Sequence, residues 1–267
     1  MRPTFGREYI ENEFQRIGDG LSEPLTVYLI GGGAMSLRDF KGATKDIDLV
    51  VPDGDAYGQL WAVLMDLGYA EVQSLDPDYR ALGATSCVEN DDGCRLDIFN
   101  QQVANKLVLT DGMQERSEPF LDLGRLTVRL VSNEDIFLFK AIAGRDDDIE
   151  DMNMLVQAGL DYDVVRDELE AQIECLGNHQ FATFANEALV ELEERYGVTT
   201  PIEDRVQELT NRYYRGLEVL QVLDEPMTVD ELAAELELET DEIRERVMYL
   251  AKFERIHRKE ESVYFAE

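Results

Sequence analysis

Three aspartates could form a metal site, because of their spacing and the strands on which they are expected to lie. Asp46 and Asp48 belong to the run 45–51, and alternation along a strand places both carboxylates on one face. Asp97 lies between apolar residues in a later predicted strand. Neighbouring carboxylates raise each other's pKa, a penalty that a hard cation such as Mg²⁺ or Mn²⁺ removes. Asp46 and Asp48 could therefore share a divalent cation, and a third carboxylate on a neighbouring strand can ligate a second ion, which is the two-metal arrangement for phosphoryl displacement.

A run of glycines stands just before these aspartates along the chain. The strand predicted over 25–30 ends in Gly31-Gly32-Gly33, after which a helix of small residues can begin. Glycine lets backbone N–H groups approach phosphate oxygens closely, and a helix N-terminus adds a favourable partial charge. A glycine pair alone is usually an ordinary turn. The order of these pieces and their strand context carry the prediction that Gly32 and Gly33 bind nucleotide phosphates.

Together these pieces resemble the polymerase-beta-like nucleotidyltransferase superfamily. The resemblance rests on residues 28–99, which carry a strand, a glycine pair, Asp-x-Asp between apolar residues and a later Asp between apolar residues. It implies an NTP as substrate and Mg²⁺ or Mn²⁺ as cofactor. It also implies that Asp46 and Asp48 ligate the metal, and that Asp97 is both the third ligand and the catalytic acceptor of the nucleophile's proton.

A second motif lies in a helix that Ser132 is expected to cap and that is predicted to run to about Val156. Its stretch from Lys140 to Asp151 looks like the AbiEii/MenT-like minimal nucleotidyltransferase branch, which carries Lys, then Arg, then two spaced Asp residues. The resemblance implies that Lys140 neutralises a phosphate of the bound nucleotide and that Asp148 or Asp151 orients it. On one continuous helix these side chains would lie near one face. The alternative is a lysine that extends to solvent beside a salt-bridged acidic helix.

The two residues before Asp46 fit the same branch, whose members often carry Arg-x-Thr-x-Asp-Ile-Asp. Thr44 and Lys45 are therefore expected to bind nucleotide, although Lys45 could instead screen Asp46 and Asp48. Lys41 stands where the branch often has an arginine, which is a departure. The resemblance to this branch covers about residues 25–155.

The hydrophobic pattern predicts both helices and strands, and the resemblance implies an α+β fold: a mixed-sheet nucleotidyltransferase core followed by a helical region and a part that resembles a winged helix-turn-helix. We expect a nucleotidyltransferase-like domain over 1–158, a helical connector over 159–200 and a winged-helix-like domain over 201–267. In the last part, two predicted helices precede two short strands, an order that resembles a winged helix-turn-helix. Such domains bind DNA through the second helix, but here that helix begins with Asp241 and Glu242, which phosphates repel. A protein partner therefore fits this module slightly better than DNA.

The composition is strongly acidic, with 57 acids against 25 bases and a net charge of −32. The acids are spread along the whole chain, and lysine occurs only at six positions: Lys41, Lys45, Lys106, Lys140, Lys252 and Lys259. Salt near 1 M shortens the Debye length to about 3 Å and screens such repulsion. The pattern favours a halophilic, haloarchaeal protein; the alternative is an ordinary acidic protein with a basic partner.

Several classes of protein are excluded by what the sequence lacks. No apolar run is long enough to span a membrane, so we expect a soluble cytoplasmic protein with no membrane partner. The three cysteines form neither a disulfide framework nor a metal-ligand spacing, and two histidines cannot build a zinc site.

The resemblance implies a metal-dependent nucleotidyltransferase that moves NMP from an NTP to a hydroxyl of RNA, protein or a small molecule, as in toxin–antitoxin pairs. One alternative is an inert or nucleotide-sensing regulator that binds DNA through the winged helix. Another is a purely structural assembly module.

Overall fold

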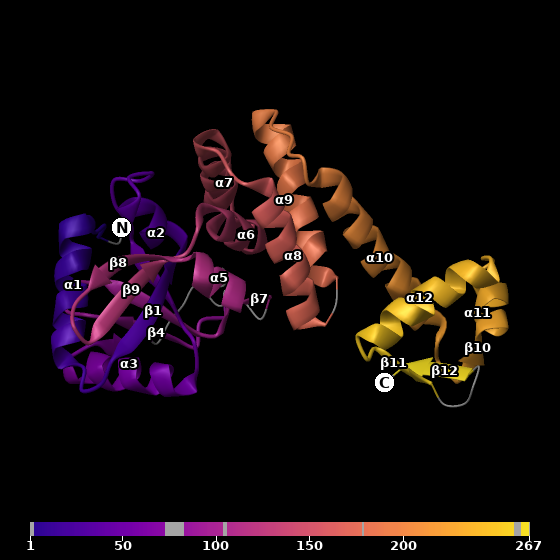
Figure 1. Ribbon diagram of the computed structural model, residues 1–267, viewed down its shortest axis with the longest axis horizontal. Helices are drawn as coiled ribbons and strands as arrows, with labels where there is room; N and C mark the ends of the chain where they lie inside the picture. The colour runs from indigo at the N-terminus through magenta and orange to yellow at the C-terminus, as the bar shows by residue number, and fades with distance from the viewer. Residues whose placement is uncertain (1–2, 73–82, 104–105, 178, 259–262, 267) are drawn as a thin grey trace.

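The computed structural model describes residues 3–72, 83–103, 106–177, 179–258 and 263–266. Figure 1 shows a sheet with its covering helices at one end, a group of helices in the middle, and a long helix that leads to a small C-terminal group. Over the described residues, no helix is both long and apolar enough to cross a membrane.

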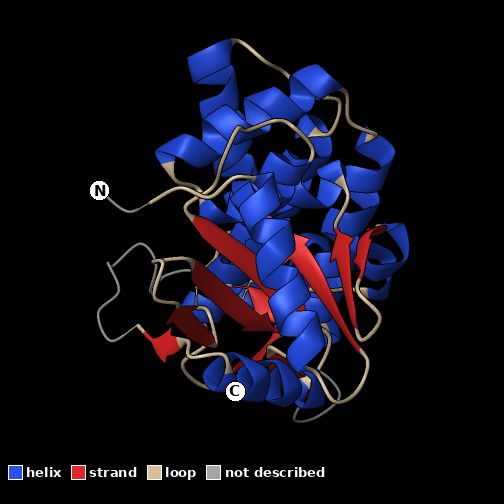
Figure 2. Ribbon diagram, turned by 90° about the vertical axis from the view of Figure 1, so that its left-hand side faces the viewer, coloured by secondary structure: helices blue, strands red, loops and turns tan. Residues whose placement is uncertain are grey.

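A mixed sheet forms the N-terminal part, and Figure 2 shows its strands side by side in the middle of the view. Over the described residues it has seven strands in the order β3-β4-β5-β2-β1-β9-β8. The central strand β2 pairs antiparallel with β1 and parallel with β5, and β1 pairs parallel with β9. The α+β prediction with a mixed sheet is confirmed. The strand bounds are β1 (Leu25–Ile30), β2 (Asp46–Val51), β3 (Ala70–Glu71), β4 (Ser86–Glu89), β5 (Arg95–Asn100), β8 (Glu118–Asp122) and β9 (Leu126–Leu130); β6 (Gln102–Val103) and β7 (Leu107–Val108) form a separate pair.

Helices cover the sheet with the apolar faces that the sequence pattern indicates. Ile10, Phe14 and Ile17 of the first helix are buried at helical spacing. Asp53 caps the third helix, because its carboxylate accepts a hydrogen bond from the backbone N–H of Ala56 at 2.8 Å. The helices of this part are α1 (Arg7–Gly20), α2 (Gly31–Leu37), α3 (Gly54–Asp66) and α5 (Asp111–Arg116).

The prediction of one continuous helix from Ser132 to about Val156 is wrong, because the segment forms two helices. Ser132 and Asp135 form a capping box at the start of the first, so the predicted start is correct. Gly144 ends that helix with φ +59°, a left-handed conformation that glycine adopts at little cost. The two helices are α6 (Asn133–Ala143) and α7 (Asp146–Ala158).

The remaining elements follow the predicted order. Gly177 and Gly197 end helices in the left-handed conformation, as expected for helix-terminating glycines. The elements are α8 (Tyr162–Leu176), α9 (Gln180–Tyr196), α10 (Glu203–Val222), β10 (Met227–Thr228), α11 (Val229–Glu235), α12 (Thr240–Lys252), β11 (Ile256–Arg258) and β12 (Val263–Ala266). The three short strands form a sheet in the order β10-β12-β11.

Buried apolar side chains form two clusters. The larger extends from Phe5 to Leu209 and the smaller from Val219 to Ile256, so α10 contributes to both. The proposed boundaries of the three parts and the winged-helix assignment stay predictions.

Candidate active site

A cavity of about 310 Å³ lies beside β2, and most of the predicted site residues line it. This volume falls within the range of small-molecule sites. Six of the eight predicted residues are in the lining: Gly32, Thr44, Lys45, Asp46, Asp48 and Lys140. The rest of the lining comes from Lys41, Ala43, Arg145, Asp147, Asp148 and Asp151. The structure therefore brings together residues that three separate stretches of sequence supply.

A larger cavity, about 530 Å³, lies between α10 and α12 and shares no residue with the first. Its lining mixes arginines, glutamates and apolar side chains, and it holds none of the predicted residues. We place the candidate site at the smaller cavity, because paired carboxylates and cations converge there.

The two aspartates of β2 face the cavity as strand alternation predicts. The alternate residues of the same strand, Ile47 and Leu49, point to the other face and are buried in the core. Gly31 has φ +60°, and a Cβ at this position would overlap the carboxylate of Asp48. Gly31 is thus the glycine that the local geometry requires. The prediction named only Gly32 and Gly33 and missed it. Its place directly before a helix and after a strand was the available signal.

The other two glycines differ in position. Gly32 lines the cavity, and a Cβ there would lie 3.3 Å from Oγ1 of Thr44. A Cβ on Gly33 would instead meet Leu29 at 3.4 Å, so Gly33 packs toward β1 and is absent from the lining. The hydroxyl of Thr44 donates to the backbone carbonyl of Asp46 at 2.8 Å, which shapes the loop before β2.

Among the residues that line the cavity, Asp48 has a strongly shifted pKa. Burial raises its pKa to about 7, and the like charges of Asp97 and Asp46 add to the effect. Lys140 and Arg145 act in the opposite direction without cancelling the shift. Negative charge is therefore under-compensated at this point, which is the condition that a bound cation relieves.

Asp97 lies directly opposite Asp48 in the parallel register of β2 and β5, yet it does not line the cavity. It is 1% exposed, and both of its oxygens accept hydrogen bonds from Arg95, at 2.6 Å from Nε and 3.1 Å from Nη2. Arg95 is itself buried, and its Nη2 also lies 3.4 Å from Sγ of Cys87. Sequence reasoning missed Arg95, although its position two residues before Asp97 on one strand face was visible. The roles assigned to Asp97 stay predictions.

Lys140 is buried in an ion-pair cluster rather than extended to solvent. Its Nζ lies 2.7 Å from Oδ1 of Asp148 and 2.7 Å from Oδ2 of Asp151. Lys41 pairs with Asp151 at 2.5 Å, and Arg145 pairs with Asp148 at 2.7 Å. We expected either Asp148 or Asp151 to orient Lys140, and both contact its ammonium group. The lysine does not extend to solvent, because its side chain is 4% exposed. The salt-bridged acidic helix of the alternative is present, since both aspartates belong to α7.

The cluster keeps Lys140 and Asp148 charged. Burial acts to lower the pKa of Lys140, but Asp148 and Asp151 outweigh it and raise the pKa. Burial likewise opposes ionisation of Asp148, yet Lys140 and Arg145 outweigh it and lower the pKa of that carboxyl. At neutral pH the cavity therefore presents fixed positive charge beside the two carboxylates of β2.

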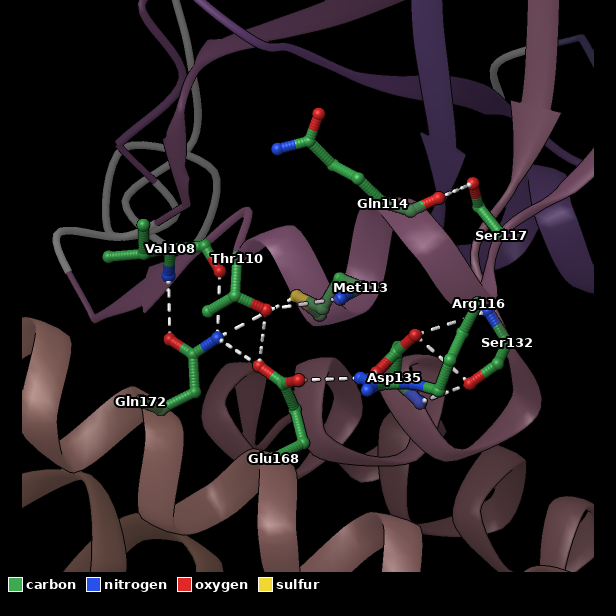
Figure 3. A network of polar contacts seen from close by, with 10 residues as sticks. All are labelled: Val108, Thr110, Met113, Gln114, Arg116, Ser117, Ser132, Asp135, Glu168 and Gln172. Carbon is green, nitrogen blue, oxygen red and sulfur yellow. Dashed lines mark hydrogen bonds and ion pairs between the residues drawn. The ribbon is translucent and has the colours of Figure 1, made fainter.

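A polar network fixes α6, and with it Lys140, against its neighbours (Figure 3). Arg116 of α5 donates to Asp135 of α6 at 2.6 Å and to Glu168 of α8 at 2.5 Å. Gln172 of α8 bonds both the N–H and the carbonyl of Val108, each at 2.7 Å. These contacts connect the strand-rich part to the helices that carry the cationic side of the cavity.

The donor chemistry fits a divalent cation at Asp46 and Asp48, whose hard oxygens share one strand face. It does not extend to Asp97, because Arg95 holds both oxygens of that carboxylate. Within the part of the chain that the structure describes, no group of three or more Asp, Glu, His or Cys side chains is arranged so that it could hold a metal ion.

One comparison with known proteins bears on this arrangement. A family model described as "Nucleotidyltransferase of unknown function (DUF6036)" matches residues 10–196, a span that contains the whole lining of the cavity. Among curated proteins, none matches the chain.

Proposed function

Because this chain belongs to the DUF6036 family of nucleotidyltransferases, we propose that it moves NMP from an NTP to a hydroxyl acceptor with a divalent cation. In that reaction the acceptor oxygen forms a bond to the α-phosphorus. The bond between that phosphorus and the oxygen bridging to the β-phosphate breaks, and pyrophosphate leaves. The hydroxyl proton passes to a carboxylate of the site or to water.

The observation that carries this proposal is the convergence of cations and paired carboxylates on one cavity. Three of the six lysines of the chain line it, together with Arg145, in a protein whose net charge is −32. Cations so scarce are not gathered at one point to balance the overall charge. Their grouping supports a polyanionic ligand such as a triphosphate.

Each side chain has a role that follows from its contacts. Lys140 neutralises a phosphate, and Asp148 and Asp151 hold its ammonium in place through the two 2.7 Å contacts. Lys45 is exposed at the cavity and can reach the outer phosphates. Thr44 shapes the loop that presents Lys45, and Gly32 leaves room for the ligand.

Asp46 and Asp48 would hold Mg²⁺ or Mn²⁺. When bound, such an ion offsets the charge of the carboxylates and polarises the phosphoryl group. The raised pKa of Asp48 supports this assignment, because burial, and after it the nearness of other carboxylates, make the charged form costly, and a shared cation offsets both effects.

The acceptor and the setting follow from the AbiEii/MenT-like resemblance and belong to the same proposal. An RNA end or a protein hydroxyl is the preferred acceptor, as in a toxin of this branch, with a small-molecule hydroxyl as the alternative. The C-terminal module, proposed as a winged helix, would dock a protein partner rather than DNA. The acidic composition supports a halophilic cytoplasm as the setting.

A second candidate is a nucleotide-sensing regulator without transfer activity. One observation favours it: Arg95 donates hydrogen bonds to both oxygens of Asp97. Active relatives are expected to use that carboxylate to bind metal and accept a proton. This candidate predicts nucleotide binding without release of pyrophosphate.

The test is transfer of α-labelled NTP in concentrated KCl with Mg²⁺. The variant Asp46→Asn with Asp48→Asn should lose transfer by about 100-fold or more, the scale of lost electrostatic stabilisation at a reacting centre. Its matched control is Asp55→Asn with Asp66→Asn, two exposed aspartates of α3 outside the cavity. Equal transfer by wild type and the first variant would overturn the proposed mechanism. Nucleotide-dependent thermal stabilisation without any transfer would favour the regulator.

A further inference from the structure

Besides Lys140, a second buried cation, Arg95, lies among the carboxylates of the candidate site. In the register of β2 and β5, Arg95 lies opposite Asp46, and Asp97 lies opposite Asp48. Strand alternation puts all four side chains on the same face of the sheet. The square therefore holds three carboxyl groups and one guanidinium that is permanently charged.

The contacts of Arg95 decide which carboxylate it serves. Its guanidinium meets Asp97 in a two-pronged pair, with Nε 2.6 Å from Oδ1 and Nη2 3.1 Å from Oδ2. This is the strong geometry for an arginine and a carboxylate, and both partners are almost fully buried. Asp46 and Asp48 instead line the cavity, where a ligand can reach them.

A second divalent cation at Asp97 would face two obstacles. It would have to displace a buried guanidinium from both oxygens, leaving that charge without its partner, which costs several kcal/mol. If the guanidinium stayed, a dication beside it would meet like charge in a water-poor setting. Asp46 and Asp48 differ from Asp97 in that they line the cavity, where water can screen the charge of an added cation.

We propose that Arg95 takes the place of one of the two metal ions, so that the chain binds a single divalent cation at Asp46 and Asp48. Asp97 is then a positioning residue that holds Arg95 beside the site rather than a metal ligand. This inference rests on the proposed function, because it specifies the cation content of that same site.

The test counts Mn²⁺ bound per chain by electron paramagnetic resonance, in concentrated KCl with a non-hydrolysable NTP. Weak binding to surface carboxylates is removed by subtracting the count for the variant Asp46→Asn, Asp48→Asn, Arg95→Gln, Asp97→Asn, which removes Arg95 together with the carboxylate that it pairs with. The expected difference is one ion for wild type and for Arg95→Lys, and two ions for Arg95→Gln. Two ions on wild type would overturn the inference while leaving the nucleotidyltransferase proposal intact. No specific ion on wild type would overturn the metal-dependent function itself.

Loss of Arg95 leaves Asp97 buried without a cation, so Arg95→Gln could fail to fold. The variant Arg95→Gln with Asp97→Asn removes both charges and should fold and bind one ion. Two ions on this variant would contradict the assignment of the single site to Asp46 and Asp48. The wild-type count decides the inference whether or not either variant folds.

Discussion

Lys140 and Asp148 meet across a helix break, with Nζ 2.7 Å from Oδ1, although one belongs to α6 and the other to α7. The break at Gly144 turns α7 back so that its first turn faces the lysine. The contact between Lys140 and Asp148 thus depends on the turn at Gly144. It does not arise from two residues that share one face of a single helix.

Replacement of Lys140 by Met should abolish transfer and destabilise the fold. The change leaves Asp148 and Asp151 without their shared buried cation, and breaking a buried pair costs about 3–5 kcal/mol. Denaturant unfolding at fixed KCl and the transfer assay measure the two effects. Lys106→Met is the matched control, because Lys106 lies over the ring of Phe184 outside the cavity. Wild-type transfer in Lys140→Met would contradict the phosphate role.

Replacement of Gly31 by Ala should destabilise the protein by more than about 1–2 kcal/mol. The new residue would have to adopt φ +60°, and its Cβ would overlap the carboxylate of Asp48. Thermal unfolding measures the loss. In contrast, Gly58→Ala should stabilise by about 0.5–1 kcal/mol, because Gly58 lies within α3 and a Cβ there meets nothing within 4 Å. A neutral Gly31→Ala would show that this segment does not pack on Asp48 as described.

The stability of the metal-free protein should depend on Asp48 between about pH 4 and 7. The folded pKa of this carboxyl is raised to about 7, so the folded state binds its proton more tightly than the unfolded chain. The contribution of Asp48 therefore falls as pH rises through this window, by at most about 1.4 kcal/mol per pH unit, and is constant above it. Unfolding of wild type and Asp48→Asn with a chelator present, compared pH by pH, isolates the effect. A constant difference between the two proteins would contradict the raised pKa.

Replacement of Arg116 by Met should destabilise the fold by about 3–5 kcal/mol, because it leaves Asp135 and Glu168 buried without their cation. Adding Asp135→Asn and Glu168→Gln to that variant should restore much of the loss. Arg166→Met is the control: its ion pairs on α8 are exposed, so less than about 1 kcal/mol is expected. Equal losses in Arg116→Met and Arg166→Met, measured by denaturant unfolding, would show that the network in Figure 3 does not connect α5, α6 and α8.

Most elements of the fold were predictable because their signals are local. A short β-rich apolar run marked β1, alternation marked β2, and glycines marked the ends of α8 and α9. The failure came at Gly144, where apolar periodicity continued across a break. A glycine within a helical pattern is compatible with either outcome, and contacts formed by α7 with Lys140 select the break.

By itself, the sequence determined that Asp46 and Asp48 share one strand face near a glycine run and that lysine is scarce. These are properties of neighbouring residues and of composition, and they need no knowledge of the rest of the fold. Only the tertiary structure decided which charges meet: Lys140 with Asp148 and Asp151, and Arg95 with Asp97. Long side chains choose partners according to which carboxylates are buried within their reach, and burial is set by how separate elements pack. The residues of the site were therefore readable from the chain, while the balance of charge within it was not.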